Sequence, residues 1–139
     1  MIYFIKCNEF VKIGFTDAKD ATGRLKAMQT GNPYSLEIIG TMPGGMYYEQ
    51  RLHILFRELN ERGEWFKLAP EILHVIEQQE IPEEAHITRE VLLEHLKKYR
   101  RIAGPGENQI HRLVKRIISN EIPLQVFIQQ VLELEEALN

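Results

Sequence analysis

The chain has 139 residues, of which 44% are hydrophobic and 27% are charged, and its formal net charge is −3. This composition permits a folded core and argues against a protein that coats nucleic acid or membranes through bulk positive charge. The single cysteine, Cys7, excludes an intrachain disulfide and a cluster of thiolate metal ligands. The sequence starts without a signal peptide pattern, and no apolar run approaches the roughly 20 residues that span a bilayer. We therefore expect a cytoplasmic protein.

The first 80 residues alternate between β-prone runs and helical patterns. Two β-prone runs, 2–6 and 11–15, flank a polar turn and predict a hairpin. Gly14 in the second run indicates a bulge or a close backbone approach. The patterns that follow predict a helix, a third strand, a helix, a short extended piece and a helix, over residues 24–29, 36–41, 47–59, 64–68 and 71–79. This order predicts an α+β domain with a small three-stranded antiparallel sheet flanked by helices.

The segment 86–139 has a different character, because it contains helical patterns and no strand pattern. We expect an all-α C-terminal segment that serves DNA binding or dimerisation, with a homodimer formed through its helices. A basic run precedes its central turn and consists of Lys97, Lys98, Arg100 and Arg101. Such cations either contact nucleic acid phosphates or form the solvated end of a helix, where positive charge is favourable.

Five polar residues stand within otherwise apolar elements of the first 80 residues. They are Tyr3, Lys12, Arg24, Glu49 and His53. Glu49 and His53 are four residues apart, so on a helix they share a face. A carboxylate that holds a hard divalent cation, an arginine that binds phosphate and a group that activates water together suit phosphodiester hydrolysis. Each of these residues, taken alone, is equally typical of a solvated helix or strand surface.

Several motifs in this region resemble those of the GIY-YIG nuclease superfamily. Ile2-Tyr3 and Lys12-Ile13-Gly14 are similar to the two motifs that name the family, and Arg24 follows where that family has an arginine. The contexts YYEQRLHILF and GEWF resemble a branch often encoded by phages and bacteria. The resemblance covers about residues 1–80 and implies a metal-dependent endonuclease that hydrolyses DNA.

The resemblance also implies roles for individual residues. Tyr3 would be a base or a water-positioning hydroxyl, Arg24 would steady the scissile phosphate, and Glu49 would bind one Mg²⁺ or Mn²⁺. His53 would transfer protons or contact phosphate. Lys12 departs from the family pattern, because it replaces the second tyrosine. As a cation it would contact phosphate, and it would act as a base only if its surroundings lower its pKa. The identity of the general base is therefore open.

Two further expectations complete this interpretation. Glu64 is expected to be structural, either as a capping residue or paired with Arg62 or Lys67, and Trp65 and Phe66 are expected to close the core. The substitution at Lys12 also favours an alternative function, in which the scaffold is a nucleic-acid-binding or regulatory module with weak or no catalysis.

Overall fold

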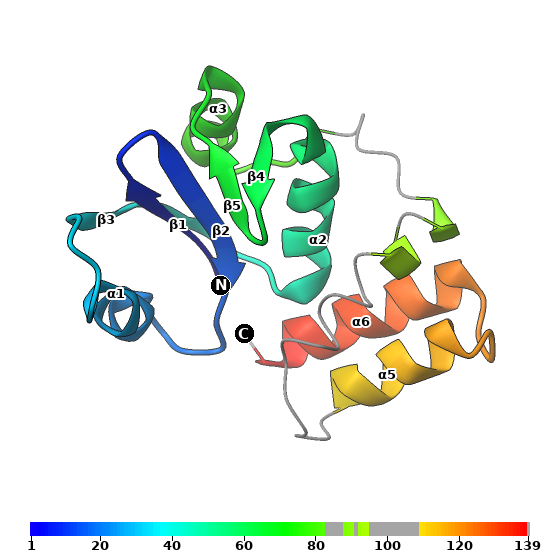
Figure 1. Ribbon diagram of the computed structural model, residues 1–139. Coiled ribbons are helices and arrows are strands. Elements are labelled where there is room, and N and C mark those ends of the chain that lie inside the picture. The colour runs from blue at the N-terminus through cyan, green and yellow to red at the C-terminus, as the bar shows by residue number, and fades with distance from the viewer. Residues whose placement is uncertain (83–87, 91, 95–108, 139) are drawn as a thin grey trace. The chain divides into compact units, whose positions relative to one another are not determined.

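The computed structural model describes residues 1–82, 88–90, 92–94 and 109–138 (Figure 1). The chain divides into two compact units, Met1–Ala85 and His86–Asn139. Among the described residues, no helix combines the length and the apolar character that crossing a membrane requires.

An antiparallel sheet of five strands, in the order β3-β1-β2-β5-β4, forms the centre of the first unit. The strands are β1 (Ile2–Cys7), β2 (Phe10–Phe15), β3 (Leu36–Met42), β4 (Asn60–Arg62) and β5 (Trp65–Lys67). The first two form the predicted hairpin, and Asn8 in its turn has a φ of 55°, a conformation that asparagine adopts more readily than most residues. The α+β class and the antiparallel sheet are confirmed.

The sheet is larger than the three strands that we expected, because the second half of the domain adds a short hairpin. Strands β4 and β5 have three residues each, and all three residues of β4 are exposed. An exposed strand of this length shows no alternation of polar and apolar residues, so its sequence carries no strand signal. The Asn60 side chain stabilises the hairpin by donating hydrogen bonds to the carbonyl oxygens of Gly63 (2.8 Å) and Trp65 (3.2 Å).

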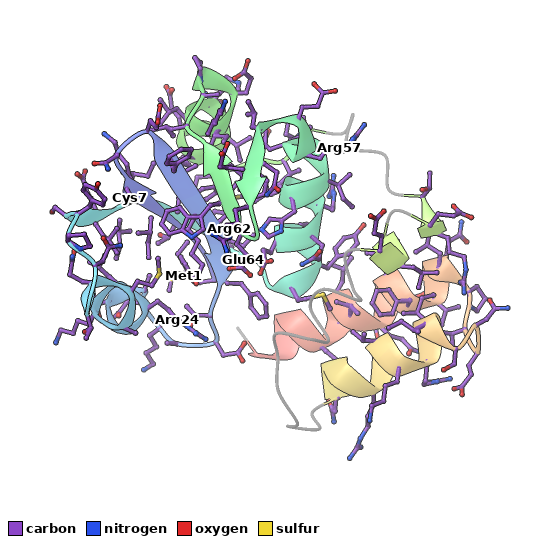
Figure 2. All side chains as sticks on the ribbon, viewed as in Figure 1. Met1, Cys7, Arg24, Arg57, Arg62 and Glu64 are labelled. Carbon is purple, nitrogen blue, oxygen red and sulfur yellow. The ribbon has the colours of Figure 1, made fainter. Side chains whose placement is uncertain are left out.

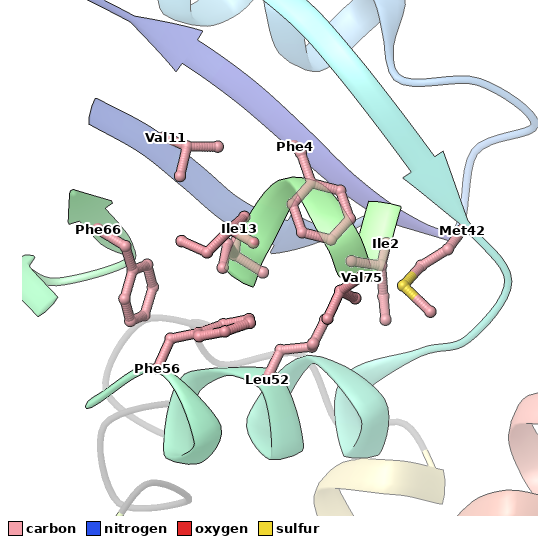
Figure 3. Packing of buried hydrophobic residues seen from close by; sticks show 10 residues of the cluster. Ile2, Phe4, Val11, Ile13, Met42, Leu52, Phe56, Phe66 and Val75 are labelled. Atoms are coloured by element: carbon pink, nitrogen blue, oxygen red, sulfur yellow. The ribbon is translucent and has the colours of Figure 1, made fainter. Parts of the chain in front are cut away.

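The helices cover both faces of this sheet. They are α1 (Thr22–Gln29), α2 (Met46–Leu55), a 3-10 turn η1 (Arg57–Leu59) and α3 (Pro70–Gln78). Leu52 and Phe56 at the end of α2, and Val75 of α3, pack on alternate residues of the hairpin (Figure 3). Leu25 and Met28 of α1 pack near Tyr3 and Ile5 on the opposite face. The predicted helix 47–59 therefore divides into α2 and η1.

The second unit contains a helical hairpin of α5 (Gln109–Ile118) and α6 (Leu124–Leu138). Its buried side chains come from both helices and the connecting turn, with one more from residues 92–94, and they are Leu92, Leu113, Val114, Ile117, Ile122, Phe127 and Val131. The turn contains Asn120, with a φ of 60°, and Pro123 directly before α6. These two helices agree with the helical patterns that the sequence of this segment shows. Lys97, Lys98, Arg100 and Arg101 lie outside the described residues.

Candidate active site

The phenol of Tyr3 lies on the sheet face that α1 covers. Tyr3 is opposite Gly14 of β2 and Thr41 of β3, and it is only 3% exposed. A Cβ atom at Gly14 would lie 2.5 Å from both Cζ and Oη of Tyr3, so the ring runs across this glycine. Gly14 was predicted to mark a bulge or a close backbone approach; the structure shows a side chain here instead, because the Tyr3 ring occupies the space that a Cβ would fill.

The surroundings of the Tyr3 hydroxyl keep it protonated at neutral pH. Burial is the main cause that raises the pKa of Tyr3 to about 12, since an ionised phenol is poorly solvated there. The Glu64 carboxylate adds to the rise, the Arg24 guanidinium opposes it, and the Glu49 carboxylate adds a smaller increment. The charges of groups from three other parts of the unit therefore act on this hydroxyl.

Lys12 forms an ion pair with Glu64 on the same face of the sheet. Lys12 is opposite Ile5 of β1 and Trp65 of β5, so its side chain is directed to the same face as that of Tyr3. Its Nζ lies 3.5 Å from Glu64 Oε2 and 3.9 Å from the sulfur of Met28 on α1. Glu64 was expected to be a capping residue or to pair with Arg62 or Lys67, and the structure pairs it with Lys12 of β2 instead.

The Glu64 carboxyl has a raised pKa. Burial is the largest cause of the rise, and the nearby charge and hydrogen bond of Lys12 oppose it, followed by the charge of Arg24. The side chain of Glu64 is 27% exposed, so water reaches it. Glu64 therefore combines a partly desolvated carboxylate with two cations that favour its ionised form.

Arg24 is exposed on the first turn of α1. The helix begins after Asp20, whose Oδ1 accepts hydrogen bonds from the backbone nitrogen (3.0 Å) and the hydroxyl (2.6 Å) of Thr22. Figure 2 shows Arg24 at the start of α1 and Glu64 at the turn between β4 and β5. Because Arg24 lowers the pKa of both Tyr3 and Glu64, its charge acts on the same small region while its side chain faces solvent.

Glu49 and His53 lie on the face of α2 that is turned toward β2. Glu49 is 1% exposed, and its Oε1 accepts a hydrogen bond from Gln50 (3.2 Å). The Nε2 of His53 lies 2.8 Å from the carbonyl oxygen of Ile13 and 3.4 Å from Glu49 Oε1. A carbonyl oxygen only accepts hydrogen bonds, so Nε2 carries the proton. The predicted pairing of Glu49 and His53 on one helix face is confirmed.

The edge of β2 connects these two groups of residues. Strand β5 pairs with β2 only as far as Lys12 and Trp65. Beyond that point the Ile13 backbone nitrogen donates to the carbonyl oxygen of Glu64 (3.0 Å), and the Ile13 carbonyl accepts from His53. Residues from the β4–β5 turn and from α2 therefore meet directly beside Gly14, over which the Tyr3 ring lies.

Comparison with known families gives this unit an identity. The family model described as the T5orf172 domain matches residues 1–80. The chain belongs to the T5orf172 domain family. This is a phage-associated domain of a nuclease-like type, which indicates a nuclease or another nucleic-acid-related role. Searches of curated proteins and of solved structures found no significant match.

The sequence-predicted residues of this T5orf172 domain come from four elements. Tyr3, Lys12 and Arg24 lie on the α1 side, and Glu49 and His53 approach from α2 at the sheet edge. Glu64 is the residue that the sequence did not identify as part of the site. It could have been found only from the register of β5 against β2, which depends on residues far apart in the sequence. No cluster of three or more His, Cys, Asp or Glu side chains suited to a metal occurs among the described residues.

Proposed function

We propose that the T5orf172 domain is a divalent-metal-dependent DNA endonuclease with a GIY-YIG-type site, acting in the cytoplasm. The observation that carries this proposal is the set of charges around the Tyr3 hydroxyl. Arg24 belongs to α1 and Glu49 to α2, which cover opposite faces of the sheet, yet both affect the pKa of Tyr3. A guanidinium and a carboxylate that both act electrostatically on one phenol suit the binding and hydrolysis of a phosphodiester.

The donor set fits one hard divalent cation. Mg²⁺ is commonly held by one or two carboxylates together with water and substrate phosphates, and it needs no cluster of three protein ligands. Glu49 supplies the carboxylate, and His53 and Gln50 fix its Oε1. When bound, Mg²⁺ or Mn²⁺ supplies positive charge to the phosphate as bonds change.

The remaining residues act on the phosphate directly. Arg24 is exposed and has no ion-pair partner within the described part of the chain, so its guanidinium is available for a two-pronged contact with phosphate oxygens. The protonated Tyr3 hydroxyl donates a hydrogen bond to a phosphate oxygen or to water. Lys12 adds a further positive charge, and His53 positions Glu49 through its hydrogen bonds. In the second unit we propose DNA contacts or homodimerisation.

Cleavage of supercoiled plasmid DNA with Mg²⁺ or Mn²⁺ tests the proposal. We expect the wild type to nick the plasmid, and we expect Glu49→Gln and Arg24→Ala to lower the rate about 10²–10³-fold, as loss of a positioned charge does in other active sites. Lys26→Ala on α1 and Glu58→Gln in η1 are matched controls, because both side chains are exposed. Thermal unfolding of each variant shows whether it is folded.

A binding or regulatory module on the same scaffold is the second candidate. The observation that favours it is the lysine at position 12, which stands where the resemblance implies a tyrosine and which is held in an ion pair with Glu64 at 3.5 Å. Binding of DNA without cleavage by the wild type, in either metal, would establish this function. Cleavage that survives Glu49→Gln would show that the site is wrong or that a contaminant cleaves.

A further inference from the structure

The T5orf172 site needs a group that accepts the proton of the attacking water, and most of its side chains are unsuited to that task. Tyr3, with a pKa of about 12, is already protonated at neutral pH. Lys12 and Arg24, as cations, only donate hydrogen bonds and have no lone pair that could accept a proton. Of Tyr3, Lys12, Arg24 and Glu64 on this side of the sheet, the carboxylate of Glu64 is therefore the group that is ready to accept a proton.

The residues on α2 are committed to other contacts. Glu49 is 1% exposed, its Oε1 lies near Gln50 and His53, and it is the metal ligand of the proposed function. The Nε2 proton of His53 is directed to the carbonyl oxygen of Ile13 at 2.8 Å. Neither residue is placed like Glu64, which is partly exposed to water.

The backbone holds Glu64 in a fixed position beside the other groups. The Glu64 carbonyl accepts the Ile13 backbone N–H at 3.0 Å, and Trp65 pairs with Lys12 in the sheet. The carboxylate is 3.5 Å from Lys12 Nζ, and its charge acts on the Tyr3 hydroxyl. A water molecule near Tyr3 would thus meet a proton acceptor that is anchored through the sheet.

We propose that Glu64 is the general base of this domain, and that it accepts the proton of the water molecule that attacks the phosphodiester. This inference rests on the proposed endonuclease function. It also answers which group is the general base in a site where Lys12 replaces the second tyrosine, since the Glu64 carboxylate takes that role. Lys12 then has a supporting role, because its positive charge favours the ionised form of Glu64 and opposes the effect of burial.

The chemical step balances with Glu64 and solvent as the proton carriers. One water proton moves to a Glu64 carboxylate oxygen as the water oxygen forms a bond to phosphorus. The bond from phosphorus to the leaving sugar oxygen breaks, and that oxygen keeps the electron pair and takes a proton from solvent. Glu64 then releases its proton to solvent, which restores the carboxylate.

The test compares the pH dependence of cleavage in the wild type, Glu64→Gln and Glu64→Ala. General bases contribute about 10²–10⁴-fold, so we expect kcat to fall by this factor in both variants. DNA affinity, measured with Ca²⁺ in place of Mg²⁺, should stay within about twofold, because the substituted group acts on water. The matched control is Glu61→Gln, an exposed glutamate in the same hairpin, and it should cleave like the wild type.

Two further measurements separate a base from a structural carboxylate. The wild-type rate should decline as the pH falls through the raised pKa of Glu64, and this decline should be absent in Glu64→Gln. Added formate should restore part of the activity of Glu64→Ala, because a small carboxylate replaces the missing one, and it should not affect Glu64→Gln.

Several results would overturn the inference. If the wild type cleaves, needs Glu49, and keeps its rate and pH profile in Glu64→Gln, then Glu64 is not the base while the endonuclease function stands. The same conclusion follows if Lys12→Met reproduces the loss and formate has no effect, since Glu64 would then act only by holding Lys12. A wild type that does not cleave DNA with either metal would refute both proposals.

Discussion

Replacement of Gly14 by alanine provides the sharpest test of how the site is built. The new Cβ would lie 2.5 Å from Cζ and Oη of Tyr3, closer than non-bonded heavy atoms approach without a shift. Tyr3 is 3% exposed and belongs to a cluster with Ile5 and Ala21, so its rigid ring has little room to move. Overpacking of this kind costs about 1–3 kcal/mol. We therefore expect Gly14→Ala to lower the unfolding free energy by that amount.

Thermal or urea unfolding of the full chain measures this cost. Tryptophan fluorescence reports the unfolding, because Trp65, the single tryptophan, lies in the same domain. Gly23→Ala is the matched control, since a Cβ at this position of α1 would have nothing within 4 Å, and alanine should stabilise the helix by about 0.4–1 kcal/mol. In a Tyr3→Leu background the cost of Gly14→Ala should shrink. Equal stability of Gly14→Ala and the wild type would refute the packing of the Tyr3 ring across Gly14.

Two other predictions concern single groups at this site. We expect His53→Ala to destabilise the domain by about 1–3 kcal/mol, because the Ile13 carbonyl loses its hydrogen-bond donor. Urea unfolding measures the change, with His74→Ala at an exposed position as the control. Equal effects of the two substitutions would contradict this role of His53. We also expect stability to decrease as the pH rises from 10 to about 12, because folded Tyr3 keeps a proton that the unfolded chain releases. Spectrophotometric titration of the wild type and Tyr3→Phe checks this, and a late-titrating phenol that persists in Tyr3→Phe would contradict it.

Local patterns in the sequence were sufficient for much of the domain. The first hairpin followed from two β-prone runs around a polar turn, and Asn8 does adopt a positive φ there. Gly14 in the second run marked a special position, although the neighbour that requires a glycine there is the Tyr3 ring and not a backbone segment. The pairing of Glu49 with His53 followed from helical spacing alone. Each of these features depends on residues within a few positions of one another, or on a single hairpin.

The features that the sequence did not reveal depend on long-range pairing. Strand β4 has only exposed residues, so nothing distinguishes it from a loop. Glu64 was expected to pair within its own hairpin, whereas the register of β5 against β2 brings it to Lys12. That register is set by burial of Phe66 beside Val11 in the core, and a one-residue shift would turn each side chain of β5 to the other face. A search among polar residues close to Glu64 in the sequence therefore did not identify Lys12 as its partner.

The shortness of β5 explains how a carboxylate from one side of the sheet reaches a phenol on the other. Backbone N–H and C=O groups that are buried must find partners, and a longer β5 would pair with β2 beyond Lys12. The Ile13 N–H still donates to the carbonyl oxygen of Glu64, directly before β5, whereas the Ile13 carbonyl oxygen accepts from His53 of α2 and not from a strand. Helix α2 packs against this open edge, so the charge of Glu49 affects the Tyr3 hydroxyl. The charge of Arg24 on α1 affects the same hydroxyl. The end of one short strand thus creates the meeting point, and the residues that complete the edge of the sheet are the same ones that form the candidate site.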